Sequence, residues 1–168
     1  MGIFSPAQLA GYVALVIGIT AFLQKNDDRL KLFNGSQGLV YALHFILLGN
    51  FPASASALLS SIRSFLALRY RSWVLGLVIL LVMAGMGVVL VRQPRGWLPV
   101  AGSCIATIAI FTMRGIPFRC ALLASTLLWL LNNVLSGSIG GTTLELVNAT
   151  ANISTMIRMA NTREKVIV

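Results

Sequence analysis

Two stretches of this chain place aromatic rings and amides inside otherwise apolar runs. Trp129, Asn132 and Asn133 stand at spacings of three and four residues, and Tyr41 and His44 stand three apart. At these spacings each set falls on one face of a helix. A ring can stack on a weakly polar solute while amides donate and accept hydrogen bonds. The pattern favours a binding site for a neutral polar solute, and interfacial anchoring of Trp and Tyr is the alternative.

A second polar stripe lies near the C-terminus. Glu145, Asn148, Asn152 and Thr155 recur at spacings of three, four and three. On a helix they span roughly 80° of the circumference, at about 100° per residue. Such a stripe cannot face lipid. We expect Asn148 and Asn152 to line the same solute site, with interhelical hydrogen bonding as the alternative.

Four ionisable residues are candidates for gating or proton coupling. His44 is the only histidine of the chain, and an imidazole titrates near neutral pH. Glu145 is the one acidic residue expected at membrane depth, where it could instead favour a helix start. Arg63 and Arg158 are expected at corresponding helix ends, where snorkelling to lipid headgroups is the alternative.

Enzyme chemistry finds no support in the residue pattern. Ser36, within Gly35–Gly38, lacks the spacing of a nucleophile elbow, and no phosphate-cradling loop or metal-ligand spacing occurs. The net charge of +9 comes from basic residues placed singly in turns, which favours membrane topology and lipid headgroups over nucleic acid. We therefore expect no enzyme, no metal and no cofactor.

The elements that position these residues are membrane helices. With 168 residues, 57% of them apolar and 10% charged, and a mean hydropathy of +0.87, the chain is too apolar for a water-soluble domain. We predict an all-α membrane protein with one transmembrane domain over residues 1–168. Seven segments approach the roughly 20 residues of a membrane helix. They are residues 7–24, 34–50, 52–71, 73–91, 97–113, 117–136 and 140–160.

The basic residues predict an orientation with the N-terminus outside and the C-terminus in the cytoplasm. In that orientation 11 of the 13 Lys and Arg residues face the cytoplasm, and only Arg92 and Arg95 lie outside. The cytoplasmic set is Lys25, Arg29, Lys31, Arg63, Arg69, Arg71, Arg114, Arg119, Arg158, Arg163 and Lys165.

An internal repeat runs through the chain at an offset of 88 residues. Tyr41 aligns with Trp129, His44 with Asn132, and Gly49 with Gly137. We predict two parallel three-helix repeats, 5–71 and 97–160, joined by a linker helix over 73–91. The register of the third helix is ambiguous, because Arg63 aligns with Arg158 only at an offset of 95.

Several motifs together resemble the YgjV type of bacterial inner-membrane proteins, and the likeness covers nearly the whole chain. This resemblance implies an inner-membrane location. The motifs are His44–Gly49, Pro52–Arg63, Trp129 with Asn133, Gly137–Thr142 and Glu145.

The 3 + 1 + 3 layout also resembles, more distantly, the transporters of the SWEET and PnuC classes. That likeness implies a central site lined by Trp129 and Asn133 with Asn148 or Asn152, and with Tyr41 and His44 opposite. The sugar transporters have a hinge proline within the first helix of each unit. Here Pro6 and Pro99 lie only near helix starts, and Gly18 is the substitute flexing point.

From these features we predict a small-solute transporter or facilitator for a neutral polar metabolite. Its expected partners are that solute and membrane lipids but no nucleic acid, and a homo-oligomer is compatible with the sequence. The alternative is a non-transporting inner-membrane scaffold or lipid-interacting protein, in which the polar stripes only hold helices together.

Overall fold

A computed structural model describes residues 2–22, 27–70, 72–113 and 115–167. Its elements are the helices α1 (Pro6–Phe22), α2 (Asp27–Leu47), α3 (Phe51–Arg69), α4 (Trp73–Leu90), α5 (Trp97–Thr112), α6 (Gly115–Leu135) and α7 (Ile139–Ile167), with the short 3-10 helix η1 (Pro94–Gly96) before α5. The prediction of seven helices and an all-α fold is confirmed for the described residues.

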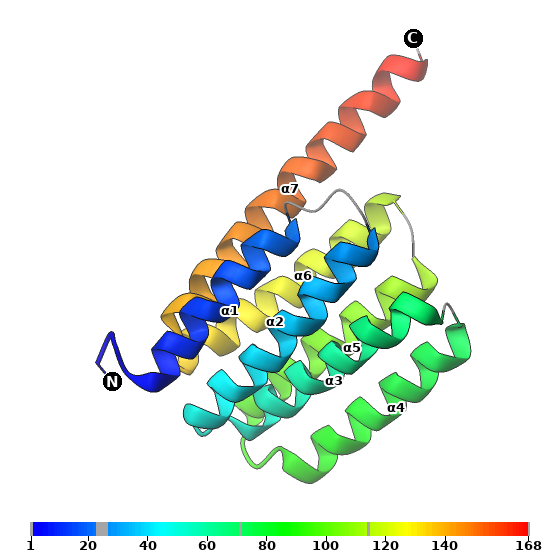
Figure 1. The fold of residues 1–168 in the computed structure, drawn as a ribbon. Coiled ribbons are helices and arrows are strands. Elements are labelled where there is room, and N and C mark those ends of the chain that lie inside the picture. The colour runs from blue at the N-terminus through cyan, green and yellow to red at the C-terminus, as the bar shows by residue number, and fades with distance from the viewer. Residues whose placement is uncertain (1, 23–26, 71, 114, 168) are drawn as a thin grey trace.

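The helices form two facing layers (Figure 1). In the front layer α1 packs on α2 and α2 on α3, and in the rear layer α5 packs on α6 and α6 on α7. The layers meet where α1 contacts α7 and where α3 contacts α5, while α4 packs outside on α3 and α5. The α2–α3 turn, the α4–α5 connection, the α6–α7 turn and the N-terminus lie at one end of the bundle, which we call the turn end (Figure 1).

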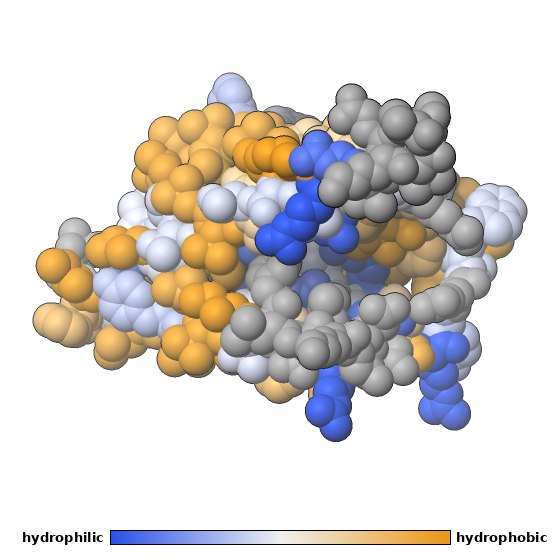
Figure 2. Space-filling model, turned by 90° about the horizontal axis from the view of Figure 1, so that it is seen from above, coloured by the Kyte–Doolittle hydropathy of each residue, from blue (hydrophilic) through white to orange (hydrophobic). Residues whose placement is uncertain are grey.

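The surface of the bundle is suited to lipid. Leu43, Val82 and Val134 are each at least half exposed, and many other large apolar side chains are exposed as well. A water-soluble monomer rarely shows so much contiguous apolar surface. Figure 2, seen from above, shows orange apolar residues over much of the visible face and a smaller group of blue hydrophilic residues near its centre.

Four helices, α3, α4, α6 and the η1–α5 stretch, are long and apolar enough to cross a membrane, and α1 is a shorter apolar helix. Seven segments were predicted to approach the length of a membrane helix, and four helices of the described residues have both the length and the apolar composition of a span. The charged first turns of α2 and the many polar residues of α7, both buried and exposed, lower the mean hydropathy below that of an ordinary span. Inside a bundle such residues are tolerated, because protein groups satisfy their hydrogen bonds.

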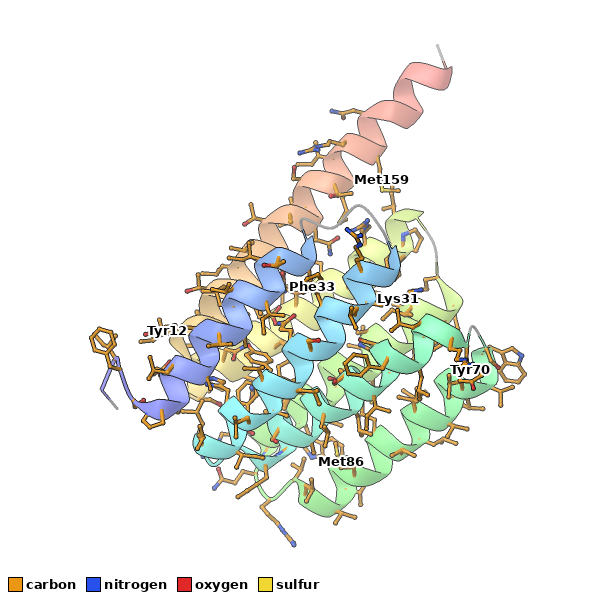
Figure 3. The ribbon with its side chains drawn as sticks, in the orientation of Figure 1. Tyr12, Lys31, Phe33, Tyr70, Met86 and Met159 are labelled. Carbon is orange, nitrogen blue, oxygen red and sulfur yellow. The ribbon has the colours of Figure 1, made fainter. Side chains whose placement is uncertain are left out.

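Two predicted boundaries were wrong. The second helix begins at Asp27, not at residue 34, since a charged first turn precedes its apolar part. The seventh helix extends to Ile167, not to 160. Its polar last turns project beyond the other helices, where Met159 lies, whereas Met86 on α4 lies near the turn end (Figure 3). Helices can continue past the membrane wherever the sequence allows it.

The core lies between the layers, near the turn end. Tyr41, Ala42 and Phe45 from α2 pack with Ala53 and Ala57 from α3, with Ala14 from α1 and with Trp129 from α6. Small residues allow the helices to approach closely, as is usual in membrane bundles. At Gly140 on α7 an added Cβ would meet the backbone of Gly11 on α1, so this crossing depends on glycine.

Candidate functional site

The candidate site begins with an aromatic pair that joins the two layers. Tyr41 on α2 and Trp129 on α6 are stacked with ring centroids 6.0 Å apart and planes 29° apart. Phe45 lies against both, at 4.8 Å from Tyr41 and 5.8 Å from Trp129. All three side chains are buried. Trp129 and Tyr41 are therefore not interfacial anchors, and each ring has another ring as its neighbour.

An amide hydrogen bond extends the aromatic pair. The Tyr41 hydroxyl donates to Asn133 Oδ1 at 2.9 Å, and Asn133 Nδ2 donates to the Trp129 carbonyl oxygen at 2.9 Å. Asn133 is fully buried. Gly141 lies directly opposite, and a Cβ added there would overlap Asn133 Oδ1 and the Tyr41 hydroxyl. The amide thus bonds within the protein on both its polar atoms.

His44 bridges α1 and the start of α7. Its Nδ1 lies 2.6 Å from the Ala7 carbonyl oxygen, and its Nε2 lies 2.7 Å from Ser138 Oγ. A carbonyl oxygen only accepts, so Nδ1 carries the proton. In the neutral ring Nε2 then accepts from the Ser138 hydroxyl, and Ser138 Oγ in turn accepts from the Gly141 N–H at 3.1 Å. Both nitrogens of this fully buried imidazole are occupied.

Asn50 makes the matching bridge from α3 to the rear layer. Its Nδ2 donates to Asn132 Oδ1 at 2.9 Å and to Ser136 Oγ at 2.8 Å. Its Oδ1 accepts from the Ala53 N–H at 3.2 Å and so caps α3. Among the described residues, Asn132 Nδ2 has no hydrogen-bond partner.

Gln8 adds a third bridge at the turn end, and this residue was not predicted from the sequence. Its Nε2 donates to the Gly137 carbonyl oxygen at 2.5 Å, and its Oε1 accepts from the Ile139 N–H at 3.1 Å. Gln8 is only 2% exposed. Gln8, Asn50 and Ser138 all lie within three residues of a helix start, where capping side chains are common, and that position was the available signal.

The polar stripe of α7, here Glu145, Asn148 and Asn152, lies farther from the turn end than the aromatic pair and faces α6 and the bundle interior. Glu145 is buried, interacts electrostatically with Tyr41 and accepts from Asn148 Nδ2 at 3.3 Å. Asn152 Nδ2 donates to the Arg119 carbonyl oxygen on α6 at 2.9 Å. Within the described residues the side-chain oxygens of Asn148 and Asn152 are buried without a partner. The stripe thus keeps unused acceptors.

The two candidate arginines lie in different surroundings. Arg63 is 9% exposed and donates to Thr107 Oγ1 on α5 at 2.6 Å, so it joins α3 to α5 and does not reach the headgroups. Arg158 is exposed and donates to Ser154 Oγ one turn earlier at 3.3 Å. The two arginines do not stand at matching places in their helices, because Arg63 comes 12 residues after the start of α3 and Arg158 comes 19 residues after the start of α7.

The structure therefore sorts the predicted residues into two groups. The first group, Tyr41, His44, Trp129, Asn132 and Asn133, lies at the turn end. Together with Asn50 and Ser138, which were not predicted, it forms a set of residues in contact that we call the seal. The second is the α7 stripe of Glu145, Asn148 and Asn152. Among the described residues no three His, Cys, Asp or Glu side chains come close enough to hold a metal ion.

A helical fold with a lipid-compatible surface and a polar interior defines an α-helical integral membrane protein. The family model described as "Imp-YgjV: Bacterial inner membrane protein" matches residues 5–163. The chain is also 41% identical over 140 residues to "Inner membrane protein YgjV" of Escherichia coli (strain K12), covering 83% of this chain and 76% of that protein. No solved structure matches. The chain belongs to the Imp-YgjV family of bacterial inner-membrane proteins.

Proposed function

We propose that this protein is a small-solute transporter or facilitator built from two parallel three-helix repeats, α1–α3 and α5–α7, joined by α4. The bounds of the helices support the repeat. The helices α2 and α6 begin at residues 27 and 115 and end at 47 and 135, and α3 and α7 begin at 51 and 139. The residue numbers in each of these pairs differ by 88, which is the offset of the internal repeat in the sequence.

The turns support the repeat in more detail. Gly49 and Gly137, 88 residues apart, have φ angles of 71° and 67°. The next residue of each turn then caps the following helix: Asn50 accepts from the N–H of Ala53, and Ser138 accepts from that of Gly141. Two turns of the same unusual conformation, followed by the same type of cap, favour duplication of one unit.

The contacts across the seal are reciprocal. Asn50 of the first repeat bonds to Asn132 of the second at 2.9 Å, and Ser138 of the second repeat bonds to His44 of the first at 2.7 Å. At the offset of 88, Asn50 matches Ser138 and His44 matches Asn132. The Tyr41–Trp129 stack pairs two matching positions with each other. This favours a pseudo-two-fold axis running through the seal, which is the arrangement on which alternating access between parallel repeats depends.

The observation that carries the transport proposal is the contrast between the seal and the α7 stripe. At the turn end aromatic rings close the interface, and His44 and Asn133 bond on all their side-chain polar atoms, with Asn132 Nδ2 as the one buried seal atom that lacks a partner among the described residues. Further along α7, the Oδ1 atoms of Asn148 and Asn152 are buried and have no protein donor within the described residues, and Glu145 is buried beside Asn148. Buried polar groups that lack partners are expected where a solute or water completes them. We interpret the seal as a closed gate and the stripe as the lining of the solute path.

This interpretation changes the roles expected from the sequence. Tyr41, His44, Trp129, Asn132 and Asn133 act in the gate, and Asn148 and Asn152 bind a neutral polar metabolite. Glu145 is the candidate for proton coupling, because it is the acidic residue of the stripe. Arg63 positions α3 against α5, and Arg158 lies outside the path.

All seven helices cross the membrane in this proposal, with the N-terminus and the turn end outside. The charges of the described residues support that orientation. Arg29, Lys31, Arg69, Arg119 and Arg158 lie toward the end opposite to the turn end, as Lys31 and Tyr70 show in Figure 3, and only Arg92 and Arg95 lie at the turn end. Lys25, Arg71 and Arg114 lie outside the described residues.

Osmotic swelling of proteoliposomes tests transport without a known substrate. Vesicles that contain the protein are mixed with an excess of xylitol, ribose or glucose, and light scattering follows solute entry. We expect faster swelling than in protein-free vesicles for at least one of these solutes. Swelling equal to that of the protein-free vesicles for all of them would count against transport of neutral solutes.

A crosslink across the gate provides the matched control. Asn50 Nδ2 and Ser136 Oγ are 2.8 Å apart, so cysteines at these two positions are close enough to be joined by a disulfide or a short crosslinker. In a background of Cys104→Ser and Cys120→Ser, crosslinking N50C/S136C should abolish swelling, and the single variants should retain it. Undiminished flux in the crosslinked protein would contradict the gate.

The second candidate function is a scaffold or lipid-interacting protein that does not transport. One observation favours it: the hydrogen bonds of His44 and Asn133 are all made within the protein. A saturated polar network can serve only to fix helix packing. In that case the seal never opens, and neither swelling nor motion of the turn end is expected.

A further inference from the structure

A cavity at the turn end lies just outside the seal. Its volume is about 360 Å³, within the range of small-ligand pockets. Leu48, Phe51 and Leu90 contribute apolar walls, and the seal residue Asn50 and its partner Ser136 form the side toward the bundle. The cavity therefore touches the α2–α3 turn, the α4–α5 connection and the α6–α7 turn together.

Two arginines line this cavity. Arg92 and Arg95 come from the short connection between α4 and α5, and both are exposed. Pro94 lies between them at the start of η1, and its fixed φ limits the conformations of this connection. Gln93, on the same connection, adds an amide to the lining. The cavity thus combines two guanidinium groups, an amide and apolar walls.

No acidic residue is available to neutralise these arginines. The chain has four acidic residues. Asp27 and Asp28 begin α2 and Glu164 lies near the end of α7, so all three lie toward the opposite end of the bundle. Glu145 is buried in the interior beside Asn148. The positive charge of Arg92 and Arg95 is left for a ligand.

The arginines also run against the charge bias of the chain. Basic residues gather at one face of a membrane protein, and an arginine on the other face works against the insertion signal. Here the two exceptions are three residues apart and share one cavity. Guanidinium groups bind phosphate and carboxylate oxygens through paired hydrogen bonds.

We propose that this cavity binds an oxyanion, a phosphate or carboxylate group, carried on an apolar body that packs against Leu48, Phe51 and Leu90. The anion is held by Arg92 and Arg95. An anionic lipid of the membrane and a soluble organic phosphate share this chemistry. The site does not depend on transport, and it would remain if the seal never opened.

Thermal unfolding in a neutral detergent tests the site with defined probes. The purified full-length protein is titrated with dioleoyl phosphatidylglycerol, with dioleoyl phosphatidylcholine of the same acyl chains, and with glycerol 3-phosphate. We expect phosphatidylglycerol, glycerol 3-phosphate or both to raise the Tm. Stabilisation by the lipid alone identifies a lipid headgroup site, and stabilisation by glycerol 3-phosphate identifies a site for soluble phosphates.

Charge-removing variants show whether the arginines carry the binding. Each arginine near a membrane surface contributes roughly fivefold to the affinity for an anionic group, so Arg92→Gln with Arg95→Gln should weaken the binding by about tenfold or more. Arg69→Gln removes an exposed arginine at the opposite end of the bundle and should change the affinity for the anion by less than about twofold. Native mass spectrometry of bound lipid gives a second readout of the same comparison. No stabilisation by either anion, or equal losses in both sets of variants, would overturn the proposal.

Discussion

At the residue scale, the hydrogen bonds of His44 and Asn133 decide how the two layers are held together. Each side chain bonds on both of its polar atoms at distances between 2.6 and 2.9 Å, and every partner except the Trp129 carbonyl, one turn before Asn133 in α6, comes from another part of the fold. A buried polar group is costly when a partner is removed and inexpensive when the bond is made. Single substitutions here should therefore have effects larger than the removed bond alone.

A double-mutant cycle measures the His44–Ser138 bond. His44→Ala and Ser138→Ala should each lower the free energy of unfolding, and the two effects should be coupled by about 1 kcal/mol because they remove one shared bond. Chemical unfolding in detergent is the measurement. Thr143→Ala is the control, since that exposed hydroxyl bonds only within its own helix, and it should be additive with His44→Ala. Additivity in both cycles would mean that the bond does not form.

Gly141 is the position where the site tolerates least change. A Cβ there would overlap Asn133 Oδ1, the Tyr41 hydroxyl and Ser138 Oγ, so Gly141→Ala should destabilise the protein by about 1–3 kcal/mol through overpacking. The matched control is Gly85→Ala on α4, where an added Cβ meets nothing within 4 Å. That variant should show no loss of Tm. Equal Tm values for the two variants would contradict the close contact.

At the scale of elements, the two turns are equivalent parts of the proposed repeat. Gly49 and Gly137 both have positive φ, and an added Cβ would meet no neighbouring atom at either position. Backbone strain is therefore the only common cost, roughly 1–2 kcal/mol for an alanine. Gly49→Ala and Gly137→Ala should lower unfolding free energies by similar amounts. Thermal unfolding checks this, and a loss at only one turn would argue against equivalent turns.

The elements also show what could be predicted from the sequence. Proline, glycine and the length of the apolar runs were sufficient for seven helices, and Pro52 and Pro99 lie in the first turns of α3 and α5 as expected. The start of α2 and the end of α7 were not predicted, because polar helical turns outside the apolar stretch leave no hydropathy signal. Hydropathy marks the membrane-embedded part of a helix but not its polar continuation.

The sequence was sufficient to predict which site residues lie near one another, but not which groups they bond to. Spacing placed Tyr41 and His44 on one face and Trp129 with Asn133 on another, and these faces do meet. That Ala7 and Ser138 occupy both nitrogens of His44 could not be predicted, since these partners come from α1 and from the turn before α7. Periodicity fixes the face of a helix, while hydrogen-bond partners depend on how the helices pack.

At the scale of the whole molecule, the orientation in the membrane can be tested by labelling. Both native cysteines are first replaced by serine, and single cysteines are then introduced at Ser136 in the α6–α7 turn and at the exposed Asn161 of α7. A membrane-impermeant maleimide should label S136C in cells with a permeable outer membrane and label N161C only after the inner membrane is disrupted. The reverse pattern would invert the proposed topology.

Transport as proposed above requires the two proposed repeats to separate at the turn end. Phe51 and Ile139 are the first residues of α3 and α7, 88 positions apart, and both are exposed, so spin labels there should leave the contacts of the seal in place. The native cysteines are replaced by serine, and spin labels are attached to F51C and I139C. Double electron–electron resonance in nanodiscs then measures the distance between the two labels, and so between the repeats. Tyr41→Phe in the same background removes the hydroxyl that bonds to Asn133 and should loosen the seal. We expect a short and a long distance population, with the long one enriched by Tyr41→Phe. A single narrow distance in both proteins would contradict it.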